Sequence, residues 1–185
     1  PHRLQRRLEL GGQDQFYLEG HIAMAIPQED DGLLVYSSTQ HPDEVQHLVT
    51  KAIGRVAKDV VCICRRMGGA FGGKESQAAT IACIASLMAV KTGRSCKLRL
   101  DRDHDMIMTG KRHDFVIDYD VGFDDSGRIR GIEFMFASRC GISADLSGPV
   151  NDRAMFHCDN AYFLENLKIT SHRCKTNTVS NTAFR

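Results

Sequence analysis

A glycine-rich run at residues 65–75, RRMGGAFGGKE, is the segment of this 185-residue chain with the most evident capacity for chemistry. Glycine has no Cβ, so it permits positive φ angles and lets backbone N–H groups approach a ligand closely. The apolar run from Asp59 to Cys64 predicts a strand before it, and Gln77 to Lys91 predicts a helix after it. A strand, a glycine loop and a helix N-terminus form an arrangement typical of anion binding.

A nucleoside-triphosphate loop is the first alternative for this segment. Gly68 and the pair Gly73-Lys74 fit that pattern, but its last position needs a hydroxyl that holds magnesium, and Glu75 stands there instead. A carboxylate at this position would repel a triphosphate, which disfavours the nucleotide interpretation. The second alternative is a simple tight turn, although two glycine pairs around Phe71 exceed what a turn requires.

Four segments, in order along the chain, together resemble the molybdenum hydroxylases. Residues 67–75 resemble that family's molybdopterin-proximal loop. Residues 11–19, GGQDQFYLE, resemble the loop and strand whose glutamine, here Gln13, faces an oxo ligand of molybdenum. Residues 152–157, DRAMFH, resemble the segment that supplies a substrate-binding arginine, here Arg153, and residues 175–185 resemble the next cofactor-side segment. Together these motifs cover nearly the whole chain, which makes them more specific than a glycine pattern alone.

Glu75 and Arg153 indicate one branch of that family. Its xanthine dehydrogenases keep a glutamate and an arginine at these positions, whereas the similar aldehyde oxidases usually lack both. A purine offers several donors and acceptors and gains negative charge when a nucleophile attacks its ring, so Arg153 would stabilise that charge while Glu75 contacts the heterocycle. Without the resemblance, Arg153 would be interpreted as an ion-pair partner of Asp152 or Asp145, and Glu75 as a carboxylate facing a helix dipole.

The resemblance implies that residues 1–185 are a fragment of the molybdopterin-binding region of a hydroxylase of the xanthine dehydrogenase type. The whole enzyme would convert hypoxanthine to xanthine and xanthine to urate with oxygen derived from water. The dithiolene of a pterin would hold molybdenum, with no side chain ligating the metal, and the residues lining this cofactor would be Gln13, Phe71, Gly72 and Arg185. Iron–sulfur clusters and FAD would lie on other segments or subunits of an oligomeric, cytoplasmic enzyme.

The general-base glutamate of the family lies much farther downstream than residue 185, so the resemblance also implies that the isolated fragment is inactive. Two further interpretations stay open. The chain could be a non-catalytic scaffold or subunit-interface segment, or it could belong to an aldehyde-oxidase-like hydroxylase of another heterocycle. The sequence does not indicate whether NAD or oxygen accepts the electrons.

Composition excludes several other classes. With 24 basic and 23 acidic residues, the formal net charge is +1, which gives no electrostatic case for binding nucleic acid or an anionic membrane surface. The seven cysteines lack the paired spacing of zinc or iron–sulfur sites. Their odd number, with no signal peptide and no apolar run long enough to cross a bilayer, predicts a reducing cytosolic setting.

The order of expected elements favours a two-layer α+β domain of mixed sheet and helices over a doubly wound sheet. Hydrophobic periodicity predicts a further helix, Pro42–Ile53, which ends at Gly54. It also predicts five further strands: Phe16–Ile26, Leu33–Ser38, Ser95–Leu100, Phe115–Phe123 and Ile129–Phe136. The helix after the glycine loop is apolar over most of its circumference, which predicts deep burial.

Three segments give weaker signals. The acidic stretch from Asp101 to Asp105 predicts a solvated turn. Periodicity fades beyond Ala137, where a loop and a short helix leading to Arg153 are expected. Residues 110–113 give a weak signal of an internal boundary.

Overall fold

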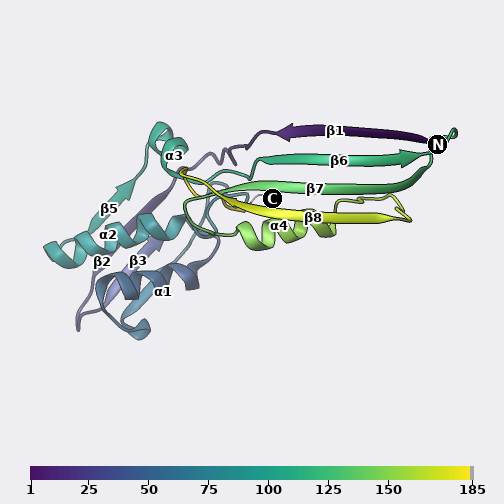
Figure 1. Ribbon diagram of the computed structural model, residues 1–185. Coiled ribbons are helices and arrows are strands. Elements are labelled where there is room, and N and C mark those ends of the chain that lie inside the picture. The colour runs from purple at the N-terminus through teal and green to yellow at the C-terminus, as the bar shows by residue number, and fades with distance from the viewer. Residues whose placement is uncertain (184–185) are drawn as a thin grey trace. The chain divides into compact units, whose positions relative to one another are not determined.

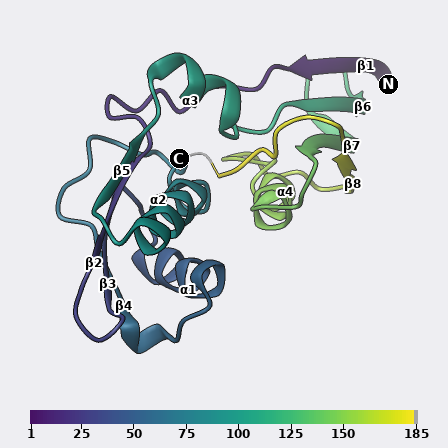
Figure 2. The same ribbon diagram turned by 90° about the vertical axis from the view of Figure 1, so that its left-hand side faces the viewer.

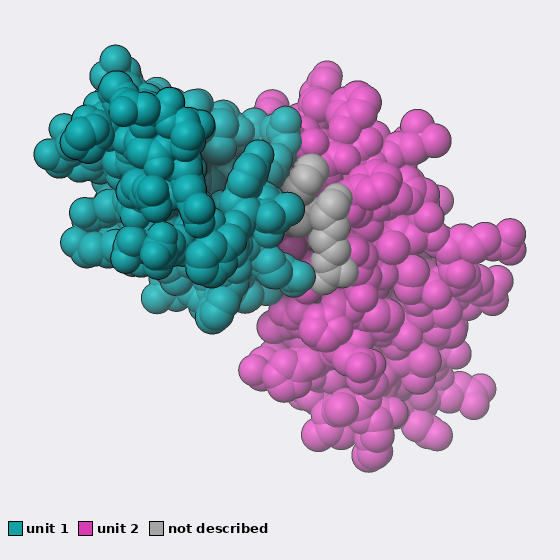
Figure 3. All heavy atoms as spheres, turned by 90° about the vertical axis from the view of Figure 1, so that its right-hand side faces the viewer, with its two compact units in different colours: residues 1–13, 111–181 teal, residues 14–110, 182–185 magenta. Residues whose placement is uncertain are grey.

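The computed structural model describes residues 1–183 and divides into two compact units. Unit 1 consists of residues 1–13 and 111–181, and unit 2 of residues 14–110 with residues 182 and 183 (Figure 3). Each unit contains a four-stranded mixed sheet with at least one helix, so the predicted α+β class is confirmed (Figure 1). The chain enters unit 2 after Gln13 and leaves it after Gly110.

The sheet of unit 2 has the strand order β4-β3-β2-β5. The strands are β2 (Ile22–Pro27), β3 (Leu33–Ser37), β4 (Val60–Ile63) and β5 (Cys96–Arg99). Strands β2 and β3 form the expected antiparallel hairpin, and β5 also pairs antiparallel with β2. Strand β4 runs parallel to β3, because α1 (Pro42–Ile53) and the short 3-10 helix η1 (Ala57–Asp59) carry the chain back before β4 begins.

Helices α1 and α2 (Ala78–Thr92) cover one face of this sheet (Figure 2). Small and β-branched side chains fill the space between them; the buried core consists of Ala23, Ala25, Leu33, Val35, Val45, Val49, Val60, Ala79, Ile81, Ala82, Ala85 and Ala89. Helix α1 has Pro42 in its first turn, and Gly54 ends it in the left-handed conformation at φ 69°. The sequence prediction of this helix and its end is confirmed.

Two predictions about unit 2 need correction. Helix α2 is apolar all round but not deeply buried all round, since Ile84, Leu87 and Met88 are exposed while its alanines face the core. The strand expected from Phe16 begins only at Ile22, and the residues before it form an irregular segment in which Phe16 has a positive φ of 48°. Apolar composition alone therefore did not locate the buried helix face or the start of the strand.

The acidic stretch predicted to be a solvated turn is instead the start of α3 (Arg102–Met108). The Asp101 carboxylate caps this helix by accepting a hydrogen bond of 2.8 Å from the backbone N–H of His104. Asp105 is buried, whereas Met106, Ile107 and Met108 are exposed. The prediction was wrong because polar residues anchor this helix, and a search for apolar periodicity does not detect such a helix.

Unit 1 contains a sheet with the strand order β1-β6-β7-β8. Strand β6 (Phe115–Phe123) and β7 (Ile129–Gly141) form the predicted hairpin, β1 (His2–Leu10) pairs antiparallel with β6, and β8 (Leu167–Lys175) pairs parallel with β7. Helix α4 (Ser147–Phe156) packs mainly against β8 (Figure 1). The sequence analysis did not anticipate β1 or β8.

Candidate functional site

Two loops of unit 2 meet at the carboxyl ends of the parallel strands β3 and β4. The first loop, residues 38–41, joins β3 to α1, and the second is the glycine loop, residues 65–75, which follows β4. Their backbones are joined directly, because the Gln40 N–H donates to the Lys74 carbonyl over 2.9 Å and the Thr39 hydroxyl donates to the same carbonyl over 3.2 Å. Loops at the carboxyl ends of neighbouring parallel strands are where α/β sheets commonly place their ligands.

Gln40 is the functional candidate that the sequence analysis missed. Its side-chain Oε1 accepts from the backbone N–H of Gly72 over 3.0 Å and from that of Lys74 over 3.4 Å. The carboxamide therefore lies against the middle of the glycine loop, with its Nε2 group as a further donor. A signal was available, since the loops that follow two neighbouring parallel strands lie at the same edge of the sheet, and Gln40 is in the loop after β3.

The glycine loop has an unusual backbone with an aromatic side chain at its tip. Gly69, Phe71 and Gly72 have φ angles of 91°, 53° and 95°, and the side chain of Phe71 is 50% exposed. A bulky residue in the left-handed region is uncommon and costs roughly 1–3 kcal/mol, so the surrounding structure must hold it there. A turn bond of 2.8 Å from the N–H of Gly73 to the carbonyl of Ala70 contributes to this restraint.

Close packing explains two of the loop's glycines. A Cβ at Gly73 would lie 2.7 Å from Cε1 of Tyr17, and a Cβ at Gly68 would lie 2.6 Å from Cβ of Glu19. The loop therefore lies directly on the irregular segment that precedes β2, and any side chain at either position would push the two segments apart.

A buried polar cluster around Lys74 holds the end of the glycine loop. The Lys74 side chain is 0% exposed, and its Nζ donates to Oγ of Ser38 over 2.8 Å and to Oε1 of Glu19 over 3.2 Å. The same Nζ lies 4.7 Å from the centre of the Tyr17 ring, and the Ser38 hydroxyl also donates to Glu19. Burial lowers the pKa of Lys74, while the hydrogen bond and charge of Glu19 oppose that change. Partial burial acts to raise the pKa of Glu19, but the bonds from Ser38 and Lys74 outweigh it and lower that pKa.

A second buried network joins the same segment to α3. The Tyr17 hydroxyl donates to Oδ1 of Asp105 over 2.6 Å, and the backbone N–H of His21 donates to Oδ2 over 2.6 Å. The Nδ1 atom of His21 lies 3.1 Å from Oδ1, and the Thr109 hydroxyl also donates to Oδ1 over 3.1 Å. Burial would raise the pKa of Asp105, but these hydrogen bonds hold it well below its ordinary range. Burial also raises the pKa of Tyr17.

The predicted site residues fall in both units. Phe71, Gly72 and Glu75 lie together on the glycine loop of unit 2, with Glu75 partly buried directly after Lys74. In unit 1, the exposed Gln13 accepts from the Arg112 guanidinium at Oε1 over 2.7 Å and from the Arg112 N–H at its carbonyl over 2.9 Å.

The two predicted arginines have different positions. Arg153 also belongs to unit 1, where it is exposed in the last turn of α4. Arg185 lies outside the described residues. Of the predicted set, the structure therefore groups the three loop residues and adds Gln40 to them.

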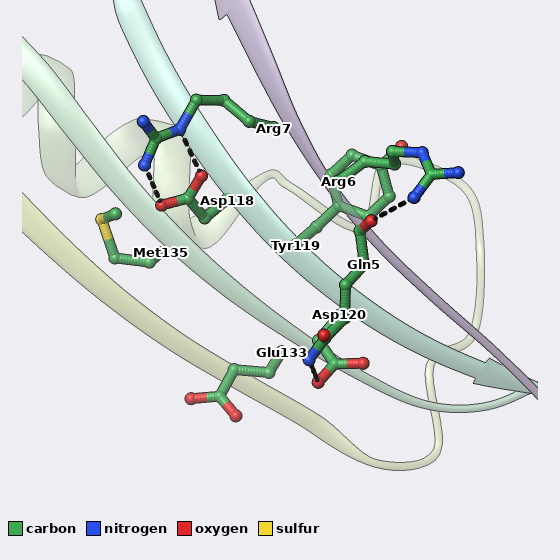
Figure 4. A pocket seen from close by; sticks show the side chains of 8 residues that line it. All are labelled: Gln5, Arg6, Arg7, Asp118, Tyr119, Asp120, Glu133 and Met135. Carbon is green, nitrogen blue, oxygen red and sulfur yellow. Dashed lines mark hydrogen bonds and ion pairs between the residues drawn. The ribbon is translucent and has the colours of Figure 1, made fainter.

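A depression of about 700 Å³ on unit 1 has a different character (Figure 4). Its three carboxylates are paired with basic side chains of neighbouring strands. The Arg7 guanidinium donates to the Asp118 carboxylate from Nε over 2.7 Å and from one terminal nitrogen over 2.8 Å, and the Gln5 amide donates to Asp120 over 2.7 Å. The hydrogen bond from Arg7 lowers the pKa of Asp118. Carboxylates satisfied in this way indicate a solvated sheet face rather than a reaction site.

Residues 1–183 contain no group of three or more His, Cys, Asp or Glu side chains placed to hold a metal ion. Over the same residues, no helix has the length and apolar character needed to cross a membrane.

Comparison with known proteins relates the whole chain to one domain type. Residues 1–185 match the family described as "Molybdopterin cofactor-binding domain". The chain is 44% identical over 184 residues to xanthine dehydrogenase of Calliphora vicina and 43% identical over 185 residues to xanthine dehydrogenase/oxidase of Gallus gallus, in each case over 100% of this chain. It spans only 14% of the length of either relative.

Solved structures show the same fold at lower sequence identity. The aldehyde oxidoreductase of Desulfovibrio gigas superposes over 100% of this chain and 20% of its own chain, with a TM-score of 0.87 and 21% identity. The quinoline 2-oxidoreductase of Pseudomonas putida 86 superposes over 100% of this chain and 24% of its own, with a TM-score of 0.85 and 17% identity.

Proposed function

Because the chain belongs to the molybdopterin cofactor-binding domain family, we propose that it forms part of the molybdenum site of a purine hydroxylase of the xanthine dehydrogenase type. The observation that carries this proposal is the glycine loop, in which Phe71 is held at a positive φ and exposed while Gln40 contacts the backbone of Gly72. Other segments of the longer protein, or other subunits, would supply the iron–sulfur clusters, the FAD and the oligomeric assembly.

The residues of unit 2 fit a pterin cofactor that carries its own metal ligands. The tip of the glycine loop offers peptide groups and an exposed aromatic ring, which are the contacts that a planar, polar heterocycle uses. Phe71 and Gly72 would line the cofactor, as would Arg185. The dithiolene sulfurs would hold the molybdenum, so the protein needs no metal-ligand cluster of its own here. Its contribution is to orient the cofactor through hydrogen bonds around the metal.

Two glutamines are candidates for the amide that faces the metal's oxo ligand. Gln13 was predicted from its sequence context, and its Oε1 is held by Arg112, which leaves its Nε2 to donate. Gln40 is held in the same way by Gly72 and lies on the glycine loop itself. Gln40 is a second candidate beside Gln13, because one set of bonds fixes both its amide and the loop that would line the cofactor. Separate substitution of each glutamine by alanine in the full-length protein would decide between them, with molybdenum content and the molybdenum electron paramagnetic resonance signal as readouts.

Glu75 and Arg153 would hold the purine. When bound, the molybdenum cofactor supplies the two-electron oxidation that replaces a ring C–H with C–OH, using oxygen from water. The Arg153 guanidinium would stabilise negative charge that develops on a purine oxygen, and one hydrogen-bond donor in such a role is worth roughly 2.7–4 kcal/mol of barrier. The Glu75 carboxylate would accept a purine N–H, or donate to a ring nitrogen if protonated. An aldehyde substrate needs neither contact, so this pair is the basis for proposing a purine.

Steady-state kinetics of the full-length protein test this assignment. In Glu75→Gln and Arg153→Met, we expect kcat/KM for xanthine to fall about 100-fold or more, while molybdenum content and turnover of a small aromatic aldehyde change little. Glu29→Gln, on the exposed turn between β2 and β3, is the matched control and should leave all three quantities unchanged. Unchanged xanthine turnover in both site variants would remove the substrate assignment. A full-length protein that never contains molybdopterin would remove the proposed function and favour a scaffold role.

A further inference from the structure

The side chain of Lys74 is a charged group that the proposed chemistry does not use. It is 0% exposed, and all of its contacts lie in unit 2: the Ser38 hydroxyl at 2.8 Å, the Glu19 carboxylate at 3.2 Å and the face of the Tyr17 ring at 4.7 Å. Burying an ammonium group is costly unless it is paired and hydrogen-bonded. An apolar side chain of similar length would fill the same volume without that cost, so stability alone does not explain a lysine here.

The backbone of Lys74 joins the same two loops as its side chain. Its carbonyl accepts from the Gln40 N–H and the Thr39 hydroxyl, and its own N–H donates to Oε1 of Gln40. The ammonium then reaches Ser38, two residues before Gln40 in the same β3–α1 loop. Lys74 therefore fixes the β3–α1 loop at two points, once through its backbone and once through its side chain.

The opposite end of the glycine loop is held by the residue that receives the ammonium. Glu19 donates its backbone N–H to the Gly68 carbonyl over 3.0 Å, and its Oε1 accepts from the Gly68 N–H over 3.4 Å. Oε1 of Glu19 also accepts from Nζ of Lys74. The pair thus links the first part of the loop to its last part across the polar cluster, and the segment that contains Phe71 and Gly72 lies between these two fixed points.

From this arrangement we propose that Lys74 is a positioning residue: its buried ammonium sets the glycine loop against the β3–α1 loop and so places Phe71, Gln40 and Glu75 for cofactor and purine. The part of this inference that concerns cofactor and purine rests on the proposed function. The part that concerns the placement of the loop does not, and it can be tested without any cofactor.

Hydrogen exchange in the full-length protein tests the placement of the loop directly. In Lys74→Met, the amides of residues 67–76, which include the Gly72 and Lys74 N–H groups bound by Gln40, should exchange about tenfold faster than in the parent protein. Ser38→Ala removes one of the two acceptors and keeps the charge, so it should give a smaller increase in the same peptides. Lys91→Met, at the exposed end of α2, should give none. Unchanged exchange in Lys74→Met would overturn the inference whether or not the protein binds molybdopterin.

Measurements of activity separate a positioning role of Lys74 from a general loss of stability. Val49→Ala, in the buried core of α1, destabilises unit 2 without touching either loop and should keep the parent kcat/KM for xanthine per molybdenum. Lys74→Met should retain less molybdenum, and its remaining sites should show kcat/KM reduced about tenfold. If Val49→Ala lost activity per molybdenum to the same extent, Lys74 would be only a structural residue. Absence of molybdenum from the parent protein would refute the proposed function and leave the exchange result valid.

Discussion

Replacement of Asp105 by asparagine should release α3 from unit 2 while leaving the rest of the unit folded. Asp105 is 2% exposed and is the buried residue of this seven-residue helix, whose apolar side chains Met106, Ile107 and Met108 face solvent. A helix this short is not stable by itself in water. The attachment of α3 therefore depends on polar contacts: the Asp105 carboxylate binds Tyr17 and the His21 backbone from the buried side, and Arg102 donates to the Tyr17 and Leu18 carbonyls.

The size of the effect follows from the geometry of the Asp105 carboxylate. Asparagine has one acceptor oxygen, whereas both carboxylate oxygens accept here, one from the Tyr17 hydroxyl and the other from the His21 N–H, each over 2.6 Å. In the variant, an NH₂ group must face one of these donors, so one buried donor loses its partner and the other loses a charged acceptor. Breaking a buried charged network of this kind costs about 3–5 kcal/mol.

Amide exchange of residues 102–109 in the full-length protein measures this cost. A loss of about 3 kcal/mol corresponds to roughly a 150-fold increase in the rate of exchange from the locally opened state. Asp103→Asn, on the exposed side of the first turn, is the control and should change the rate little. An increase below about threefold in Asp105→Asn would refute the argument that this carboxylate holds α3 in place.

The pH dependence of the same experiment has a defined sign. The folded-state pKa of Asp105 is lowered from its ordinary value of about 3.9. The stabilisation that Asp105 gives to the folded state is therefore complete above the ordinary pKa, and it is lost as the pH falls toward the folded-state pKa. The difference between parent protein and Asp105→Asn should therefore stay constant from about pH 8 to pH 5 and shrink below about pH 4. A difference that grew on acidification would contradict the assignment of an ionised Asp105 in the folded state.

Two further substitutions test the packing of unit 2. Gly73→Ala places a Cβ 2.7 Å from Cε1 of the buried Tyr17, so it should destabilise the glycine loop by about 1–3 kcal/mol. The loop amides should then exchange faster with solvent. Exchange at the parent rate would show that the loop can move away from Tyr17 without cost. Gly54→Ala forces an L-residue to φ 69° at the end of α1, where nothing lies within 4 Å of the new Cβ. Backbone strain alone should therefore lower the stability of the folded state by about 1–2 kcal/mol, and amides at the end of α1 should exchange faster. Gly11→Ala, where φ is not positive and nothing lies within 4 Å of the new Cβ, serves as the comparison without that strain.

Much of the fold followed from local sequence patterns. Helix α1 could be predicted with its end at Gly54, because apolar periodicity, an N-terminal proline and a left-handed glycine are all local signals. The hairpins β2–β3 and β6–β7 were also local, since a polar turn separates two apolar runs in each. Helix α3 was missed because its stability depends on Asp105 and its partners on a distant segment.

The division into units could not be predicted in the same way. Strand β1 pairs with β6, and β8 pairs with β7, so residues 1–13 belong with residues 111–181 although about a hundred residues of unit 2 lie between them. Pairing across such a distance leaves no periodic signal in either strand, because β1 and β8 are largely exposed and carry mostly polar residues.

The sequence by itself determined the glycine loop and its likeness to a molybdopterin site, because glycine spacing, Phe71 and Glu75 are properties of one short segment. Only the tertiary structure showed which residues hold that loop. Gln40 and Glu19 are ordinary polar residues in the sequence, and they reach Gly72, Lys74 and Gly68 only because β3 and β4 run parallel and the segment before β2 lies beneath their ends. Contacts between segments depend on strand order and direction, and these are decided by the packing of the whole unit rather than by any local pattern.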